Sequence, residues 1–546
     1  MQKSIPKNIL KWLISIVVIG LFYWFSLPPI NVKSREFWSF LTISIIICIV
    51  INAFSQVIEL IKNATNSNTK VLGVPKINLK SIGRPIKFVL IYIVIITVLS
   101  VVASIIGAEI FNAKRYNQLI TVEDGNFSQD IAEISQDQIP VVDRDTASRL
   151  SQRKLGEMAD LVSQFEIEDL YTQINYKGKP VRVTPLIYGD IIKWFNNQSE
   201  GIPAYITVDM ATQDTTLVRL KDGIKYSESE YFMRDLNRAL RFKYPTKIFG
   251  NISFEIDENG TPYWVASTVG FEIGYWSGSD INGAVLMNAV TGESKFYKPS
   301  EIPTWVDQVY DSDLVLEQLN YNGKYRSGFF NSIFGQRGVL QTTDGYNYLA
   351  ISDDVYLYTG MTSVTSDESN VGFVLTNLRT KATKFYSIPG AEEYSAMSSA
   401  EGQVQHLKYS STFPLLLNVS NRPTYFMSLK DSAGLVKMYA FVDVNQYQIV
   451  GTGSTVEFAR EDYISKLKSG NVTDVPDTEP TENSGVIEKI NSAVVEGNTV
   501  YFIKIKDQEQ IFTVPISKSD ALPFATVGQT VKFKLNGNTI TSIEFE

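Results

Sequence analysis

The segment at 283–297, GAVLMNAVTGESKFY, indicates the fold because a second copy follows at 372–386, GFVLTNLRTKATKFY. Eight of the fifteen positions are identical without a gap, including the Lys-Phe-Tyr at the end of each copy. Each copy contains an apolar strand, a turn that begins at Asn288 or Asn377, and a second strand, which is the pattern of a β-hairpin. A hairpin that recurs along a chain predicts a repeated architecture.

Looser copies of this hairpin occur at 203–220 and 438–453. A further apolar piece precedes each of the four hairpins, and these pieces are GKPVRVTPL at 178–186, NGTPYWVAS at 259–267, DGYNYLAIS at 344–352 and RPTYFMSL at 422–429. The pattern predicts four related units. Because helical stretches separate the strands, we expect an α+β domain over residues 112–469 in which helices cover one face of repeated antiparallel sheets.

Two helices are predicted with defined starts. The first covers 227–242, SESEYFMRDLNRALRF, where Ser227 and Glu230 have the spacing of a capping box. The second runs from about Thr146 to Phe165 and begins near Asp143 or Asp145.

The hairpins at 284–297 and their counterparts, each preceded by a YWVAS-like strand, resemble the PepSY module, a small secreted helix-plus-hairpin domain. The resemblance covers about 180–453 and carries no catalytic residue. It implies binding or inhibition of partners, including peptidases, around the cell envelope. The whole layout also resembles membrane proteins of Gram-positive bacteria, some of which are labelled CvpA-like or cell-shape proteins.

Three apolar runs precede this domain, at 12–30, 37–57 and 88–110. A run of about 18 or more uncharged residues is long enough to cross a bilayer as a helix, so the sequence predicts a three-helix transmembrane anchor over residues 1–111. A cleavable signal peptide is the alternative interpretation of the first run, but no small-x-small cleavage site follows it.

Basic residues predict the orientation of this anchor. Nine lie before the first run or between the second and third, and two, Lys33 and Arg35, lie between the first and second. Because basic residues in short loops stay cytoplasmic, we expect a multi-pass protein of the cell membrane with a cytoplasmic N-terminus and an extracellular C-terminal domain. Residues 1–110 have a net charge of +8 (11 basic, 3 acidic), which leaves −16 for the remainder and argues against a nucleic-acid partner.

Beyond residue 469 the composition changes twice. Residues 470–483, GNVTDVPDTEPTEN, read as an acidic flexible linker. Residues 484–546 contain five strand-like runs with turn signals between them, which predicts a small all-β barrel resembling an OB-fold. A spacer or protein-contact role suits this segment better than nucleic-acid binding, because it has no basic aromatic groove.

The sequence offers little for catalysis. His406 is the one histidine and Cys48 the one cysteine, and Cys48 lies in the second apolar run. A catalytic triad or a histidine-rich metal site therefore has no basis, and we expect no catalytic residue, no metal and no cofactor. Paired acids remain the alternative, because two carboxylates across a cleft can hydrolyse a glycoside. The candidate acids are Asp311, Asp313, Asp353-Asp354 and Glu392-Glu393.

Aromatic residues supply one candidate ligand site. Tyr275 and Trp276 lie in GYWSGSD and Trp305 follows in the chain, so the three could form a platform that stacks on a sugar, although aromatic residues in a β-rich domain are more often core. The resulting hypothesis is a non-enzymatic surface protein that is anchored in the lipid bilayer and binds or scaffolds a wall polymer or an envelope protein. The alternatives are a carboxylate-dependent envelope hydrolase and a regulatory subunit of a transport or secretion assembly. The sequence leaves the oligomeric state open.

Overall fold

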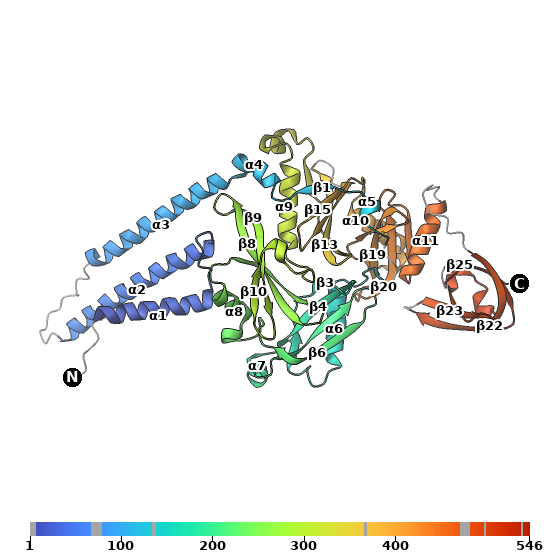
Figure 1. Cartoon of the computed structure of the whole chain (residues 1–546), viewed down its shortest axis with the longest axis horizontal. Helices are drawn as coiled ribbons and strands as arrows, with labels where there is room; N and C mark the ends of the chain where they lie inside the picture. Colours follow the sequence, from blue (N-terminus) through green and yellow to red (C-terminus); the bar gives the residue numbers. More distant parts are fainter. Residues whose placement is uncertain are drawn as a thin grey trace.

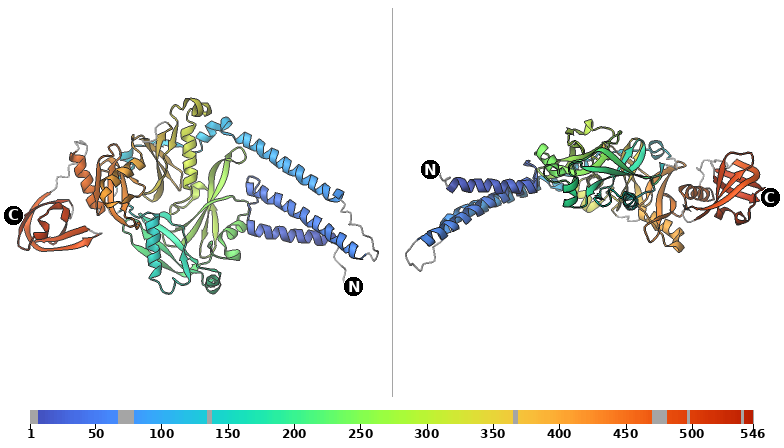
Figure 2. Two further views of the ribbon diagram at one scale, coloured as in Figure 1. Left: turned by 180° about the vertical axis from the view of Figure 1, so that it is seen from behind. Right: turned by 90° about the horizontal axis from the view of Figure 1, so that it is seen from below.

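The computed structural model describes residues 7–66, 79–133, 138–364, 369–469, 481–495, 498–536 and 539–545. Three long helices project from one end of an elongated body of sheets, and a small barrel lies at the opposite end (Figure 1). The two termini therefore lie at opposite ends of the molecule, as the views from behind and from below also show (Figure 2).

The projecting helices are α1 (Lys7–Ser26), α2 (Arg35–Asn66) and α3 (Leu79–Gly107). Among the described residues, the stretch Lys87–Gly107 of α3 is the one that is long and apolar enough to cross a membrane. The prediction of three membrane spans is therefore wrong. The apolar part of α1, Lys11–Ser26, is shorter than the roughly 20 residues that a bilayer requires. The expected span at 37–57 runs past residue 51, where the described side chains of α2 end, and the part before it is too short by itself.

Four sheets form the body, and each is built on four consecutive strands that pair antiparallel as a meander. We call them sheets 1 to 4. Their strands are β3 (Thr172–Tyr176), β4 (Lys179–Tyr188), β5 (Ile202–Asp209) and β6 (Thr215–Ile224) in sheet 1; β7 (Phe249–Ile256), β8 (Pro262–Ile273), β9 (Ser277–Asn288) and β10 (Ser294–Tyr297) in sheet 2; β12 (Asn347–Ile351), β13 (Asp354–Ser363), β14 (Ser369–Asn377) and β15 (Thr383–Tyr386) in sheet 3; and β18 (Leu415–Val419), β19 (Arg422–Lys430), β20 (Val436–Asp443) and β21 (Val450–Gly453) in sheet 4.

A helix precedes each sheet in the chain. These helices are α6 (Arg144–Gly156), α8 (Leu236–Lys243), α9 (Ser312–Lys324) and α10 (Glu393–Gln403), and α11 (Val456–Ser469) follows sheet 4. Short strands extend three of the sheets, namely β2 (Phe165–Ile167) in sheet 1, β1 (Val122–Asp124), β11 (Leu340–Thr342) and β16 (Gly390–Ala391) in sheet 3, and β17 (Ser410–Ser411) in sheet 4. The remaining helices of the body are α4 (Glu109–Asn117), α5 (Phe127–Asp130) and α7 (Ile191–Asn197).

The third strand of every sheet ends in the same turn. Asp209, Asn288, Asn377 and Asp443 each accept hydrogen bonds from the backbone N–H groups two and three residues later, at 2.8–3.0 Å. A short acidic or amide side chain suits this position because it bonds to its own turn. The four hairpins predicted from the sequence therefore share the same turn at the same position.

The pairing of the strands corrects the position of one of the four apolar pieces that precede the hairpins. Tyr263 pairs with Asn288 and Tyr356 pairs with Asn377, so β13 in sheet 3 corresponds to β8 in sheet 2. The segment DGYNYLAIS at 344–352 instead leads into and forms β12, one strand earlier. Both strands of sheet 3 are rich in Tyr and Leu, so composition alone cannot separate them.

Both predicted helices change their limits. The helix expected at 227–242 is shortened to α8, whose N-cap is Asp235, with its side chain accepting from the N–H of Arg238 at 2.8 Å. Glu230 does not cap a helix but is buried. The helix expected to reach Phe165 ends at Gly156, and its N-cap is Asp143, one of the two residues predicted for that role. Phe165 begins β2 instead, where it lies in the core.

The sheets bury both of their faces in part. Val265 and Leu286 of sheet 2 pack in one cluster with Leu357 of sheet 3, whereas Trp264 and Met287, on the opposite face of sheet 2, belong to the largest core. Side chains that alternate along a strand point to opposite faces, which is why neighbours in sequence enter different cores. Both faces of sheet 2 are therefore covered, each by a different hydrophobic cluster.

The C-terminal segment forms a closed barrel in the order β22 (Thr481–Val495), β23 (Asn498–Ile505), β24 (Ile511–Pro515), β26 (Thr539–Phe545) and β25 (Thr530–Asn536). It has its own core around Phe512 and Phe533. The predicted linker lies largely outside the described residues, and its last residues belong to β22.

Candidate functional site

The predicted aromatic platform is not assembled. Tyr275 and Trp276 lie at the turn between β8 and β9, with their ring centroids 5.0 Å apart. Trp305 instead packs on Tyr263, at 5.0 Å between centroids. Ten residues of extended β8 separate Tyr263 from Ile273, which corresponds to roughly 33 Å at 3.3 Å per residue. The two aromatic pairs therefore lie at opposite ends of one hairpin.

The candidate acids have structural contacts. Asp354 forms an ion pair with Arg379 at 2.6 Å, and Asp311 caps α9 by accepting from the N–H of Leu314 at 3.0 Å. Glu393 is fully buried and accepts from the hydroxyl of Tyr358 at 2.9 Å. The other members of these pairs, Asp353, Asp313 and Glu392, are not placed across a cleft from them in any described cavity.

His406 and Cys48 also lie apart from any acid cluster. His406 is exposed in the short 3-10 turn Gln405–Leu407, and Cys48 is half-buried in α2. Within the described ranges no group of three or more His, Cys, Asp or Glu side chains could hold a metal ion.

A buried acid pair that the sequence does not mark lies where sheets 1, 2 and 3 meet. Glu255, in β7, accepts from the backbone N–H groups of Asp307 at 2.8 Å and of Gln308 at 3.1 Å. Asp307 in turn accepts from the N–H of Asn175 in β3 at 2.7 Å and of Val355 in β13 at 3.2 Å. The pair thus ties three sheets together through backbone groups. A single acid in an alternating strand gives no signal of such a role.

The environment of this pair opposes its ionisation. Burial raises the pKa of Glu255 to about 6. Burial and the neighbouring charge of Glu255 raise the pKa of Asp307 well above its usual range. A raised carboxyl pKa is also found in general acids, but both side chains are almost fully buried and line none of the described cavities. We therefore assign a structural role to Glu255 and Asp307.

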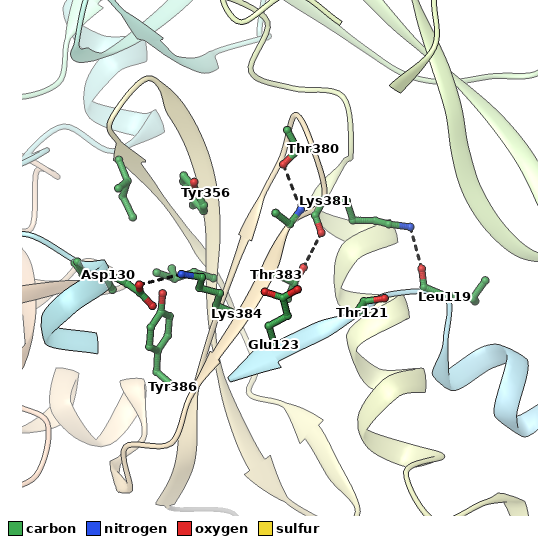
Figure 3. Close-up of a pocket in the computed structure, with 14 residues that line it drawn as sticks. Leu119, Thr121, Glu123, Asp130, Tyr356, Thr380, Lys381, Thr383, Lys384 and Tyr386 are labelled. Carbon is green, nitrogen blue, oxygen red and sulfur yellow. Dashed lines mark hydrogen bonds and ion pairs between the residues drawn. The ribbon is translucent and has the colours of Figure 1, made fainter. Parts of the chain in front are cut away.

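A polar pocket of about 520 Å³ lies where β1 adds to the edge of sheet 3 beside β15 (Figure 3). Lys384 reaches across it to Asp130, at 2.9 Å. Lys381 points away from that pair and binds Asp280 at 2.6 Å and the carbonyl of Leu119 at 2.9 Å. Both lysines are thus already neutralised by acids of other segments.

The surroundings of Asp130 and Tyr386 favour the ordinary charge state of each. The hydrogen bond from Lys384 lowers the pKa of Asp130, and burial together with Asp130 raises the pKa of Tyr386. At neutral pH the pocket therefore presents an ionised acid, a paired lysine and a neutral phenol. This arrangement suits recognition of a polar group, and neither Asp130 nor Tyr386 has the pKa of a general base near neutrality.

A group of exposed apolar side chains on the body surrounds Trp194 of α7. Ile192 is 66% exposed, Phe195 69% and Phe232 65%. The ring of Trp194 contacts those of Phe195, Phe232 and Tyr231, with centroids 4.7–6.4 Å apart. We call this region the α7 surface and define it by its exposed members Ile191, Ile192, Phe195, Tyr231, Phe232 and Met233.

Buried groups hold the α7 surface in place. Glu230 is almost fully buried and accepts from Nε1 of Trp194 at 2.8 Å and from the hydroxyl of Tyr188 at 2.9 Å. Phe232 has φ +54°, a left-handed conformation that costs a bulky residue about 1–3 kcal/mol. Exposed apolar side chains beside a strained backbone position are typical of a binding surface.

No family model and no curated protein matches this chain. One solved structure that covers most of it is a levansucrase from Bacillus subtilis, which is 11% identical over 77% of this chain and 98% of that one, with a TM-score of 0.14. Such a score supports no conclusion about fold or activity.

Proposed function

We propose that this chain is a membrane-anchored surface protein whose body binds or scaffolds an envelope protein without catalysing a reaction. The α7 surface carries the proposal, because a contiguous group of exposed large apolar side chains is the ordinary mark of a protein contact. A wall polymer fits this surface less well, because the six residues that define it offer one hydroxyl and no charge.

The anchor in this proposal includes the candidate span Lys87–Gly107. The loop between α1 and α2 lies on the same side of the membrane as the body, because the N–H of Ile30 donates to the carbonyl of Pro245 at 2.6 Å and Lys33 donates to the carbonyl of Phe271 at 3.2 Å. Five basic residues occur between 70 and 87 at its N-terminal side, and Glu109 follows its end. Since short basic flanks remain cytoplasmic, the body and the barrel would lie on the outer face of the membrane. The acidic net charge of the region after the span suits an exposed location.

The PepSY resemblance supports the same proposal, because such modules act through partners. Four sheets built on the same meander, each preceded by a helix, give the body several faces for contact. The terminal barrel adds a separate unit, which we propose to be OB-like and to serve as a spacer or a second contact.

Accessibility of introduced cysteines tests the placement. In a Cys48→Ser background the chain has no other thiol, so Ser163→Cys, at an exposed position of the body, can be labelled alone. We expect a membrane-impermeant maleimide to label Ser163→Cys in intact cells from which the wall has been removed, and Ser81→Cys, in the basic flank before the span, only after lysis. Labelling in the reverse order would overturn the orientation.

Photo-crosslinking tests the binding function. A photoreactive residue at position 195 should give one discrete adduct in cells, and Ile192→Ser with Phe232→Ser should abolish it. Phe524, which is 82% exposed on the barrel, provides the matched control, because Phe524→Ser should leave the adduct unchanged. Release of fragments from wall material by the purified protein, lost with Glu123→Gln and Asp130→Asn in the polar pocket, would instead establish a hydrolase.

A further inference from the structure

Two adjoining cavities lie between the beginning of α2, the last turns of α3 and the turn of the β8–β9 hairpin. Their volumes are about 590 and 600 Å³, within the range of ligand sites. They share four lining residues, which are Trp38, Ile96, Ser100 and Trp276. In the ribbon view the end of the hairpin reaches toward the space between α2 and α3 (Figure 1).

The first cavity is polar at one end. Arg35 lies over the ring of Trp276, with its guanidinium carbon 5.9 Å from the ring centre, and hydroxyl-bearing residues such as Thr42 and Ser104 line the same space. Arg35 forms no ion pair with any described carboxylate. Nε1 of Trp276 is buried and has no hydrogen-bond partner within the described structure. A cation and an unsatisfied N–H at one place favour an anionic oxygen.

The second cavity is mostly apolar. Leu99, Val102, Ala103 and Ile106 of α3 line it together with Tyr275. The four residues of α3 belong to the final turns of the candidate span. The cavity therefore lies where the hydrocarbon layer would end, and it adjoins its polar neighbour along α3.

The charges around the two cavities favour a negative ligand. Lys33 donates to the carbonyl of Phe271 at 3.2 Å, and Arg115 donates to the carbonyl of Glu272, so both cations hold the end of the hairpin. With Arg35 they place three cations at this end of the hairpin. Tryptophan and basic residues at the edge of a span are also the usual anchors at a membrane interface.

We propose that these cavities hold one anionic phospholipid of the surrounding bilayer. Its phosphate oxygens bind between the guanidinium of Arg35 and Nε1 of Trp276, and an acyl chain occupies the apolar cavity beside Ala103. The inference rests on the proposed membrane placement and adds a lipid that would tie the hairpin of sheet 2 to α3.

The test uses the full chain in nanodiscs of phosphatidylcholine that contain a minor share of phosphatidylglycerol. Native mass spectrometry counts the lipids that remain bound on release. We expect selective retention of phosphatidylglycerol, and Arg35→Gln should lower that selectivity about tenfold, the equivalent of one charge-assisted hydrogen bond of about 1.4 kcal/mol. Trp276→Phe keeps the ring but removes the donor, and should weaken retention in the same direction. Ala103→Phe fills the tail cavity and should remove retention of either lipid.

Arg153→Gln is the matched control, since Arg153 is an exposed arginine on α6, 81% exposed at the side chain, and its loss should change nothing. Equal retention of both lipids by the unmodified chain, or unchanged selectivity in Arg35→Gln, would overturn the lipid site while leaving the anchor intact. Release of the protein from membranes by alkaline washing would overturn the membrane placement itself, and the lipid site with it. Preference for an uncharged lipid would also contradict the proposal, because Arg35 would then have no role.

Discussion

The backbone N–H of Asp307 donates a hydrogen bond of 2.8 Å to Oε2 of Glu255, although both residues carry buried carboxyl groups. Asp307 follows the β10 hairpin of sheet 2 and uses its own carboxylate to accept from β3 and β13. Two acids at a three-sheet junction are tolerated because backbone donors satisfy their oxygens. The cost of burying them appears in their raised pKa values.

This pair predicts a dependence of stability on pH. Because the pKa of Glu255 is about 6 in the folded chain and 4.5 without the fold, the folded state holds more protons between these values. The free energy of unfolding therefore falls as pH rises through this window and is largest below it. For Glu255 alone the full change is about 2 kcal/mol, of which about 1 kcal/mol falls between pH 5 and pH 7, and Asp307 acts in the same direction. Urea denaturation of the full chain at pH 7 and pH 5 measures it.

A variant of the pair checks the assignment. Asp307→Asn removes one charge while keeping the side-chain size, so we expect a smaller gain in stability between pH 7 and pH 5. Asp353→Asn, an exposed acid next to sheet 3, should leave the gain unchanged. An equal pH dependence in all three proteins would place its origin elsewhere.

Glu230 is predicted to be essential for the shape of the α7 surface. Glu230→Ala leaves the hydroxyl of Tyr188 and Nε1 of Trp194 without an acceptor, which should cost about 2–4 kcal/mol. Glu230→Gln keeps one acceptor oxygen and should cost less. The denaturation midpoint measures both variants, and the crosslink from position 195 should weaken with the alanine. A silent alanine variant would contradict the role.

The shared turn predicts which side chains are tolerated at its first position, where Asn288 lies in sheet 2. Asn288→Asp should cost little, because Asp209 and Asp443 make the same two bonds in sheets 1 and 4. Asn288→Ala removes both bonds and should lower the free energy of unfolding by about 1 kcal/mol. Thermal unfolding of the two variants distinguishes them, and equal losses would show that the side-chain oxygen is irrelevant.

The contact between α3 and the β8–β9 turn depends on two glycines. A Cβ at Gly274 would lie 3.0 Å from Cα of Gly107, and Gly274 has φ +61°. Gly178 has φ +76° with open space around it, so Gly178→Ala carries the backbone cost of about 1 kcal/mol without the clash. We expect Gly274→Ala to cost more and to speed hydrogen exchange at residues 273–277. Equal exchange in the two variants would show that the turn does not rest on α3.

Several features could be predicted from local sequence. The hairpins ending in Lys-Phe-Tyr form β9–β10 and β14–β15, and Asp143 caps α6 as one of its two expected candidates. Local patterns succeed here because turns and caps involve neighbours in the chain. The helix start at Ser227 fails for the opposite reason, because Glu230 bonds to Trp194 and Tyr188, which precede it by 36 and 42 residues.

The membrane region shows the same division. Hydropathy identifies the apolar runs, but the prediction of three spans gives way to one candidate span among the residues that the structure describes. The platform of Tyr275, Trp276 and Trp305 fails because Trp305 packs at the other end of the β8–β9 hairpin.

The sequence by itself determined the recurring hairpin, the apolar stretch before the body, the acidic balance of the remainder and the scarcity of histidine and cysteine. The tertiary structure alone decided that Glu255 and Asp307 meet, that exposed apolar side chains gather around Trp194, and that Arg35 lies over Trp276. Each of these contacts joins residues from different elements. Their partners are chosen by how the sheets and helices pack, which no local periodicity records.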